Sequence, residues 1–290
     1  MHDTRSLESD LRALGIAEGG LLIVHSGYKA LGEVDGGPPT VIAALRRAVG
    51  HAGTLLTPSF TTNLVDPYTW PEPPPPEERI RIMAEMPCFD PAKSAPYKMG
   101  AIVNALWRTP GVRRSGHPVS SWLALGPRAE ELTRNHPIDD PEGLYGPVGR
   151  AYRGDAQVLL LGVEHDADTT IHLAESLLDM PHLRSLPDRF PVDEGGRREW
   201  RLVAKTTKCS DGFVRIDPHL EAAGAIRRGR VGDAPCQLLQ SRGIVKVATG
   251  LLSAQPTALF CGDEECVHCP TSRQVLEDWQ PAPSWRDRLV

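Results

Sequence analysis

One stretch limits the fold of this chain more than any other: residues 157–180, which read QVLLLGVEHDADTTIHLAESLLDM. Residues 157–163 form a short apolar run of the length of a buried strand. A polar loop follows, and either Asp168 or Thr169 can cap the helix after it. The apolar residues of that helix recur at helical spacing and are Ile171, Ala174, Leu177 and Leu178. The order strand, tight loop, helix indicates an α/β unit.

The predicted helix carries a histidine and a glutamate that can work together. His172 and Glu175 are three residues apart, so they lie on one face of the helix. An imidazole beside a carboxylate, just after a buried strand, fits a general base with a partner that orients it. The local pattern leaves three other interpretations open: a surface ion pair, half of a metal site, or a packed histidine.

Strand and helix signals alternate through the first 180 residues and change in character afterwards. Strands are predicted at 20–24, 53–58 and 120–126, and helices at 4–14, 39–49, 100–107 and 128–135. Later strand signals occupy 197–208, 213–220, 229–234 and 236–239, with a helical or mixed segment at 243–253. The pattern predicts a single α/β domain, residues 1–290, with an α/β portion at 1–180 and a β-rich portion at 181–290.

A proline-rich segment interrupts the first portion at residues 63–78. Proline lacks a backbone N–H group, so such a run does not form the interior of a helix or sheet. We expect an ordered flap or a mobile lid here, with residues 70–78 at its centre.

Composition and charge exclude several classes of protein. The net charge is −5, which gives no reason to expect binding to nucleic acid or to an anionic membrane. No apolar run has the length of a membrane span, and the first residues do not resemble a signal peptide, so a cytoplasmic protein is expected. The glycine motifs of nucleotide-binding kinases and dehydrogenases, and the G-x-S-x-G nucleophile elbow, do not occur.

Four separated segments, taken together, resemble the aminoglycoside 3-N-acetyltransferase family. They read LLIVHSGYKALGEVDGGPPTVIAAL with GTLLTPSFT, CFDPAKSAPYKMGAI, RTPGVRRSGHPVSSWLALGPRAEEL with NHPIDDPEG, and QVLLLGVEHDADTTIHLAE. They span residues 21–175, and weaker similarity continues through residues 231–234. The resemblance implies a mixed sheet flanked by helices, without the common N-acetyltransferase fold. It also implies transfer of acetyl from acetyl-CoA to the 3-amino group of the deoxystreptamine ring of aminoglycosides, and hence antibiotic resistance.

The resemblance assigns expected roles to named residues. His172, in T-x-x-H-x-x-E, is the expected general base, and Glu175 is its partner. A neutral imidazole near pH 7 can accept the proton that an ammonium group must lose before it attacks a thioester. Residues expected on the CoA side are His25, Ser26, Ser115, His117 and Ser121.

The acceptor side is expected to be acidic, because aminoglycosides are polycations. Candidate contacts are Asp90, Asp139 and Asp140, together with Asp168, which stands where the family usually has Asn. Val103-Asn104 replaces the usual Pro-Glu after M-G-A-I. These departures leave a different amine open as the acceptor, such as a biosynthetic intermediate. A relative that binds zinc without catalysis, and a homodimer, are also left open.

Three cysteines, Cys261, Cys266 and Cys269, crowd into nine residues near the end of the chain. With Cys209 or His268 they could hold a structural Zn²⁺ in a tetrahedral site. Reduced surface thiols, or one disulfide in an oxidising compartment, are the alternatives.

Overall fold

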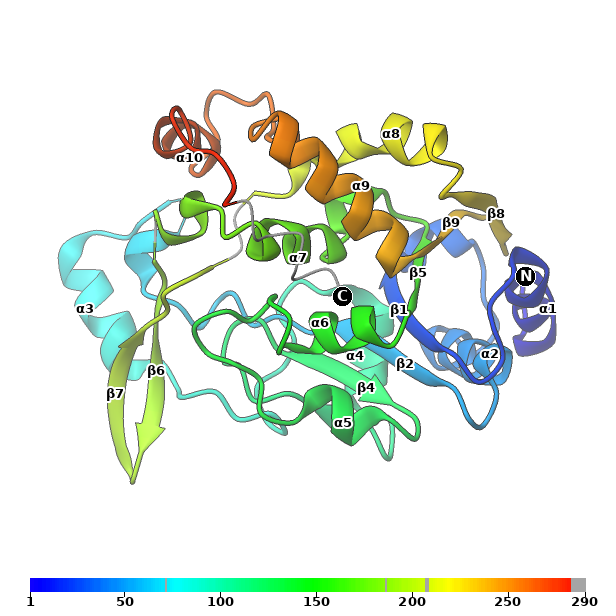
Figure 1. Ribbon diagram of the computed structural model, residues 1–290. Coiled ribbons are helices and arrows are strands. Elements are labelled where there is room, and N and C mark those ends of the chain that lie inside the picture. Colours follow the sequence, from blue (N-terminus) through cyan, green and yellow to red (C-terminus); the bar gives the residue numbers. More distant parts are fainter. Residues whose placement is uncertain (71, 186, 207–208, 283–290) are drawn as a thin grey trace.

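A seven-stranded mixed sheet forms the centre of the structure, a computed structural model that describes residues 1–70, 72–185, 187–206 and 209–282 (Figure 1). In spatial order the strands are β3 (Arg113–Arg114), β4 (Trp122–Leu125), β2 (Thr54–Pro58), β1 (Leu21–Ser26), β5 (Gln157–Leu161), β9 (Ala234–Gln240) and β8 (Arg227–Val231). Strands β2, β1 and β5 are parallel, whereas β4 and β9 run antiparallel to them.

The central strands are apolar on both faces, because helices cover the sheet on each side. Successive side chains of a strand point to opposite faces. Ile23 and Leu160 accordingly enter one core, and Leu22 and Leu159 enter the other. Strands buried on both faces read as continuous apolar runs in the sequence, and this explains why β1 and β5 were predicted correctly.

Two groups of helices fill these cores. On one side pack α1 (Thr4–Leu14), α2 (Pro38–Val49) and α4 (Gly100–Trp107). The other core receives α5 (Ala129–Thr133), α6 (Pro147–Arg153), α7 (Thr170–Leu177), α8 (Asp217–Ala222), α9 (Ser241–Ala254) and α10 (Cys269–Val275). The predicted α/β class, a mixed sheet flanked by helices, is confirmed. Among the described residues, no helix combines the length and the apolar character needed to cross a bilayer.

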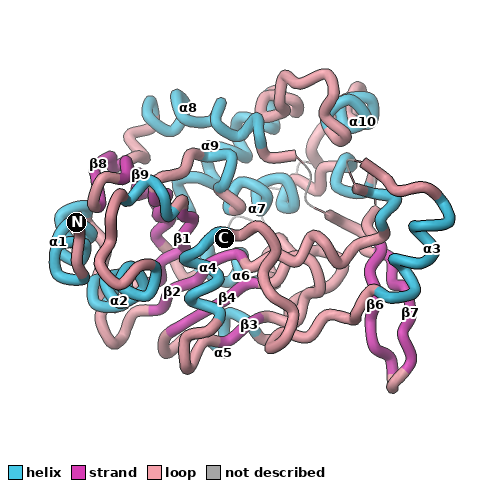
Figure 2. Tube along the Cα trace, turned by 180° about the vertical axis from the view of Figure 1, so that it is seen from behind, coloured by secondary structure: helices cyan, strands magenta, loops and turns pink. Residues whose placement is uncertain are grey.

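A hairpin outside the main sheet lies beside α3 (Pro76–Glu85) at one end of the molecule, as both views show (Figures 1 and 2). It consists of β6 (Arg189–Glu194) and β7 (Arg197–Leu202). Arg198 of β7 donates to the carbonyl oxygen of Met86 at 2.7 Å and also to that of Ala84, so the hairpin is tied to the end of α3. The proline-rich segment therefore leads into a helix that begins at Pro76, and residue 71 lies outside the described residues.

The second half of the chain differs from the prediction in one segment. Strands β6 to β9 all lie within residues 189–240, as the predicted β-rich portion requires, although β7 ends at Leu202 and residues 207–208 are outside the described residues. The strand predicted over 213–220 is wrong, because this segment forms the 3₁₀ helix η5 (Asp211–Ile216) and α8. Phe213, Ile216 and Leu220 are fully buried, and their spacing of three and four residues suits a helix.

The single-domain interpretation of residues 1–290 stays a prediction. It agrees with the position of β8 and β9, which complete the same sheet as β1 and β5. The polar tail predicted at the end of the chain is described only as far as residue 282.

One buried carboxyl group lies in the core beside β4. The indole N–H of Trp122 donates to Glu142 Oε2 at 3.2 Å, and Glu142 Oε1 has no hydrogen-bond partner among the described residues. Burial raises the pKa of Glu142 well above its usual range. The folded protein therefore keeps a proton that the unfolded chain loses above about pH 4.

We expect the substitution E142Q to flatten the dependence of stability on pH. The stabilisation from the protonated carboxyl is present below about pH 4 and is lost as the pH rises towards the raised pKa. Urea unfolding should show that the free energy of unfolding falls more between pH 5 and pH 8 for the wild type than for E142Q. The control is E33Q, at an exposed glutamate. Equal losses in wild type and E142Q would contradict a protonated Glu142.

Candidate active site

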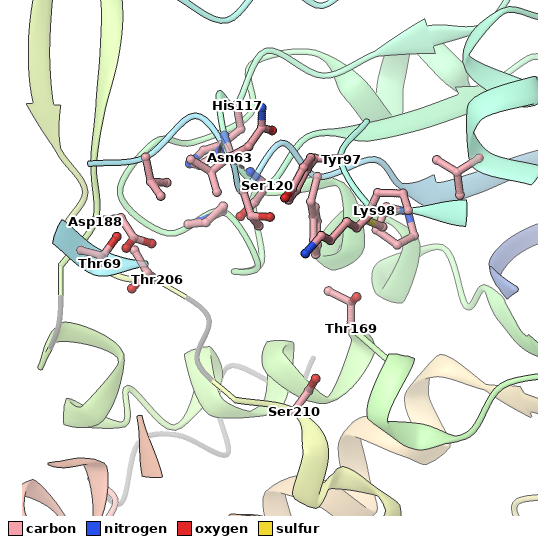
Figure 3. Close-up of a pocket in the computed structure, with 18 of the residues that line it drawn as sticks. Asn63, Thr69, Tyr97, Lys98, His117, Ser120, Thr169, Asp188, Thr206 and Ser210 are labelled. Carbon is pink, nitrogen blue, oxygen red and sulfur yellow. Dashed lines mark hydrogen bonds between the residues drawn. The ribbon is translucent and has the colours of Figure 1, made fainter. Parts of the chain in front are cut away.

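A cavity of about 1200 Å³ opens at the carboxyl ends of the parallel strands (Figure 3). Strand β2, the next strand in the sequence, pairs with one edge of β1, whereas β5, much later in the sequence, pairs with the other edge. In α/β sheets a ligand binds at such a point, outside the carboxyl ends of the strands. The volume exceeds the upper end of the usual range for one small ligand, about 1,000 Å³, and so suits two substrates together.

His172 and Glu175 lie on α7, at the wall of this cavity. The Nδ1 atom of His172 is 2.6 Å from Glu175 Oε2. The other carboxylate oxygen, Oε1, is 3.2 Å from Nε2 of His182, in the 3₁₀ helix η4 (Pro181–Arg184). His172 lines the cavity and Glu175 lies behind it, at 2% exposure. Because Nδ1 is held by the carboxylate, Nε2 is the ring nitrogen of His172 left for a substrate.

The electrostatics of this cluster keep Glu175 ionised. Burial alone would raise its pKa, but the charges and hydrogen bonds of His172 and His182 outweigh burial and lower the pKa to about 2. An ionised Glu175 accepts from Nδ1–H of His172, which leaves the lone pair of the neutral imidazole on Nε2. The same carboxylate stabilises the imidazolium after Nε2 takes a proton.

A second cluster surrounds Asp168. Its Oδ2 is 3.2 Å from Nδ1 of His165, its Oδ1 accepts from the backbone N–H of Thr170 at 3.0 Å, and His25 Nε2 lies 3.9 Å away. Burial lowers the pKa of His25, and Asp168 opposes this shift. His25 and Ser26 line the cavity, as expected for the CoA side, but Asp168 does not. In this structure Asp168 is a buried partner of two histidines, and its predicted contact with the substrate stays a prediction.

Two of the predicted CoA contacts lie elsewhere. Ser115 accepts from the backbone N–H of Trp122 at 2.8 Å and donates to His136 Nδ1 at 2.9 Å. Ser121 donates to the carbonyl oxygen of Ser59 at 2.8 Å and accepts from Arg114 at 2.9 Å. Both serines are fully buried and neither lines the cavity, so their contact with CoA stays a prediction that the geometry does not support.

His117 lines the cavity, but its two ring nitrogens are occupied. Nδ1 accepts from the backbone N–H of Ser120 at 2.8 Å, and Nε2 lies 3.2 Å from the carbonyl oxygen of Ile138. Burial lowers the pKa of His117 to about 4, so the ring is neutral near pH 7. Neither ring nitrogen of His117 is therefore free to bind a ligand in this structure.

The predicted acceptor carboxylates also lie away from the cavity. Asp90 pairs with Lys93 at 3.1 Å. Asp139 is 4.0 Å from Arg201, and Asp140 accepts from Ser176 at 2.7 Å. None of the three lines the cavity, so their contact with the acceptor stays a prediction that the geometry does not support.

Other charged side chains, which the sequence pattern did not single out, do line the cavity. The carboxylates are Glu72, Glu85, Asp166 and Asp188, and Lys98 is the one lysine or arginine among the described lining residues. Figure 3 shows Tyr97, Lys98 and Ser120 on one side of the cavity and Thr169 and Ser210 on the other. Only Asp166, in the loop before α7, stood in a segment where a sequence signal could have identified it.

The predicted cysteine cluster is brought together by the fold. Cys261, Cys266 and Cys269 are joined by Cys209, and their four Sγ atoms lie within 4.8 Å of one another. Ser210 and His268, the chain neighbours of Cys209 and Cys269, line the cavity, and the four thiols could hold a metal ion.

The sequence model of the aminoglycoside 3-N-acetyltransferase family matches residues 23–253. The chain belongs to this family. It is 38% identical over 253 residues to aminoglycoside N(3)-acetyltransferase VII of Streptomyces paromomycinus, covering 82% of this chain and 87% of that protein. The predicted resemblance is thus confirmed, and the chain is an acyltransferase of the family.

Solved structures of the family share the fold. A histidine-to-alanine mutant of aminoglycoside acetyltransferase AAC(3)-IVa in complex with a gentamicin superposes with a TM-score of 0.81 at 33% identity, covering 94% of this chain and 97% of that one. AAC-IIIb in a binary complex with CoASH gives a TM-score of 0.76 at 32% identity, covering 88% of this chain and 97% of that one.

The structural role of Ser115 can be tested by measuring both the free energy of unfolding and the Kd for CoA of a variant. We expect S115A to lower the free energy of unfolding by about 1–3 kcal/mol, because the N–H of Trp122 and Nδ1 of His136 lose a buried partner. The Kd for CoA, measured by calorimetry, should not change. The comparison variant is S26A, at a serine that lines the cavity and should weaken CoA binding. A weaker Kd for S115A with unchanged stability would restore the original assignment.

Proposed function

We propose that this protein transfers the acetyl group of acetyl-CoA to the 3-amino group of the deoxystreptamine ring of aminoglycosides, and so confers resistance to them. The observation that carries the proposal is the His172–Glu175 pair at 2.6 Å, on the wall of a cavity large enough for two substrates. The relatives support it, since curated members are aminoglycoside N(3)-acetyltransferases.

The proposed reaction is a direct transfer between the two substrates. His172 Nε2 removes a proton from the 3-ammonium group, and the resulting amine attacks the thioester carbonyl carbon. A C–N bond forms and the C–S bond breaks, with CoA leaving as a thiolate. The nitrogen loses a second proton as it becomes an amide. Of the two protons that the ammonium group releases, one ends on the CoA thiolate and the other goes to solvent, and Glu175 stabilises the imidazolium of His172 that holds the first. No covalent acyl-enzyme forms, so the sequence needs no nucleophile elbow.

The donor is assigned to the side of the cavity formed by the end of β1. His25 and Ser26 line the cavity there, and a relative of the same fold is known with CoASH bound. The developing oxyanion needs hydrogen-bond donors, for which the Ser26 hydroxyl and backbone N–H groups near the strand ends are candidates. His117, whose nitrogens are occupied, would contribute ring contacts only.

The charge of the cavity suits the proposed acceptor. Four carboxylates against one lysine among the described lining residues give the cavity an excess of negative charge, which suits a polycation. A relative is known in complex with a gentamicin.

A different amine is the second candidate acceptor, for one specific reason. Val103, which stands where the family usually has Pro, lines the cavity, whereas the side chain of Asn104 donates to the carbonyl oxygen of Gly100 at 2.9 Å. The cavity wall at this position therefore differs from that of family members with proline, and we expect the range of accepted amines to differ from theirs. We place the reaction in the cytoplasm, where acetyl-CoA is available. A homodimer stays a prediction, to be checked by light scattering.

Replacing His172 by alanine should lower kcat by about 10²–10⁴-fold, the usual effect of losing a general base. The Kd for acetyl-CoA should change little, because Nε2 faces the amine rather than the cofactor. The matched control is H51A, at an exposed histidine far along the chain. Turnover of H172A close to that of the wild type would remove His172 from the mechanism.

The acceptor can be identified with a panel of deoxystreptamine aminoglycosides. We expect gentamicin-like or kanamycin-like compounds to gain one acetyl group, detected by product mass, with the 3-position assigned by NMR. The assay should avoid thiol reagents, since none of the six cysteines of the protein forms a disulfide. If acetyl-CoA binds but no member of the panel is acetylated, the acceptor is a different amine and substitutions at Val103 become the first test.

A further inference from the structure

Four sulfur atoms from two distant segments meet behind the cavity. Cys209 precedes η5, whereas Cys261, Cys266 and Cys269 lie between α9 and the start of α10. Their Sγ atoms lie within 4.8 Å of one another, and those of Cys261 and Cys269 are 3.4 Å apart. Tetrahedral zinc with Zn–S bonds of about 2.3 Å holds its sulfur ligands about 3.8 Å apart. We propose that these four cysteines bind one structural Zn²⁺ ion.

Backbone N–H groups point at one sulfur of the cluster, as they do around the thiolate ligands of a metal ion. The N–H group of Cys269 donates to Cys266 Sγ at 3.4 Å, and that of His268 also bonds this sulfur. Two N–H groups directed at the first thiol of a C-x-x-C turn stabilise a thiolate there, because they donate to its negative charge. The spacing C-x-x-C is itself one of the common zinc-ligand spacings.

Charge near the cluster also favours a metal-thiolate centre. Four thiolates around Zn²⁺ carry a net charge of −2, after the thiol protons have passed to solvent. Arg273 donates to the carbonyl oxygen of Cys261 at 3.1 Å, and Arg215 donates to that of Phe260 at 2.5 Å. Neither guanidinium forms an ion pair with a carboxylate in the described part of the chain, so both are available to balance this charge.

The alternatives account less well for the geometry. A disulfide has an S–S bond of about 2.05 Å, and no pair in the cluster is at that distance. Cys261 and Cys269 are buried, so the cluster is not a set of surface thiols. The two remaining cysteines, Cys88 and Cys236, lie outside the cluster, so the gathering is specific to the four.

The metal would also support the cavity. Ser210, next to Cys209, and His268, next to Cys269, both line it. The ring of Phe213 packs edge-on against His172 with centroids 4.8 Å apart, and Phe260, next to Cys261, packs against His182 at 5.3 Å. Zinc would therefore fasten together the two segments that cover the histidines on either side of Glu175. This consequence rests on the proposed function, but the metal site does not.

The metal content of the purified protein tests the site. After dialysis against a chelator, the untagged wild type should retain about one equivalent of zinc by elemental analysis, and C209S and C266S should each lose most of it. These two thiols are partly exposed, which limits damage to the fold. The control is C88S, at a partly exposed cysteine outside the cluster, which should keep its zinc. Zinc-free wild type after expression in zinc-supplemented medium, or full retention by C209S and C266S, would overturn the proposal.

A spectroscopic test uses the wild type alone and does not depend on the variants folding. Cobalt added to the zinc-free protein should give the intense visible bands of tetrahedral Co²⁺ with sulfur-to-cobalt charge transfer, and added zinc should abolish them. Weak bands of an octahedral complex would contradict the four-sulfur site.

The link with the cavity has its own readout. Zinc removal should raise the KM for the amine more than that for acetyl-CoA, because the segments that carry Ser210 and His268 are no longer held in place by the neighbouring zinc ligands. Added zinc should return both KM values to those of the untreated protein. A protein that is isolated with zinc but has no acetyltransferase activity would refute only the proposed function. A protein that is isolated active but without zinc, and whose kinetics do not change when zinc is added, would refute only the metal site.

Discussion

A single buried carboxylate, Glu175, sets the requirements that the surrounding structure meets. An ionised group at 2% exposure is stable only if its neighbours replace the water that it has lost. His172 and His182 do so from opposite sides, one on α7 and the other on η4. Their rings are in turn packed by Phe213 and Phe260. The orientation of the reactive nitrogen therefore depends on packing from segments that are far apart in the chain.

The sheet explains why this carboxylate faces a cavity at all. Strands β1, β2 and β5 end at one edge, and α7 begins close to the end of β5, so polar residues after each strand gather around one space. Both faces of the sheet are covered by helices, so the free edge is the place where a ligand can enter. The same arrangement brings His25 and Ser26, at the end of β1, and His172, on α7, to the lining of one cavity.

The sequence predicted the parts of this arrangement that depend on local spacing. The pair His172 and Glu175 follows from helical periodicity, and β1 and β5 follow from apolar runs. His182 could not be predicted, because a turn separates it from Glu175. Ser115 was assigned to CoA on the strength of its motif, but the direction of a buried hydroxyl depends on tertiary contacts, here those with Trp122 and His136.

Acidic residues of the cavity were missed for a related reason. Glu85 lies on a helix that the proline-rich pattern concealed, and Asp188 precedes a hairpin strand whose position depends on Arg198. Helix α3 and the β6–β7 hairpin lie outside the main sheet, whereas His172 and Glu175 lie on α7, which packs against the core of the sheet. The segments that carry Glu85 and Asp188 are thus structurally separate from α7, which carries His172. Under the proposed function, substitutions in those segments would change which amines are accepted while His172 and Glu175 keep their geometry, so the substrate range could diversify at little cost to the chemistry.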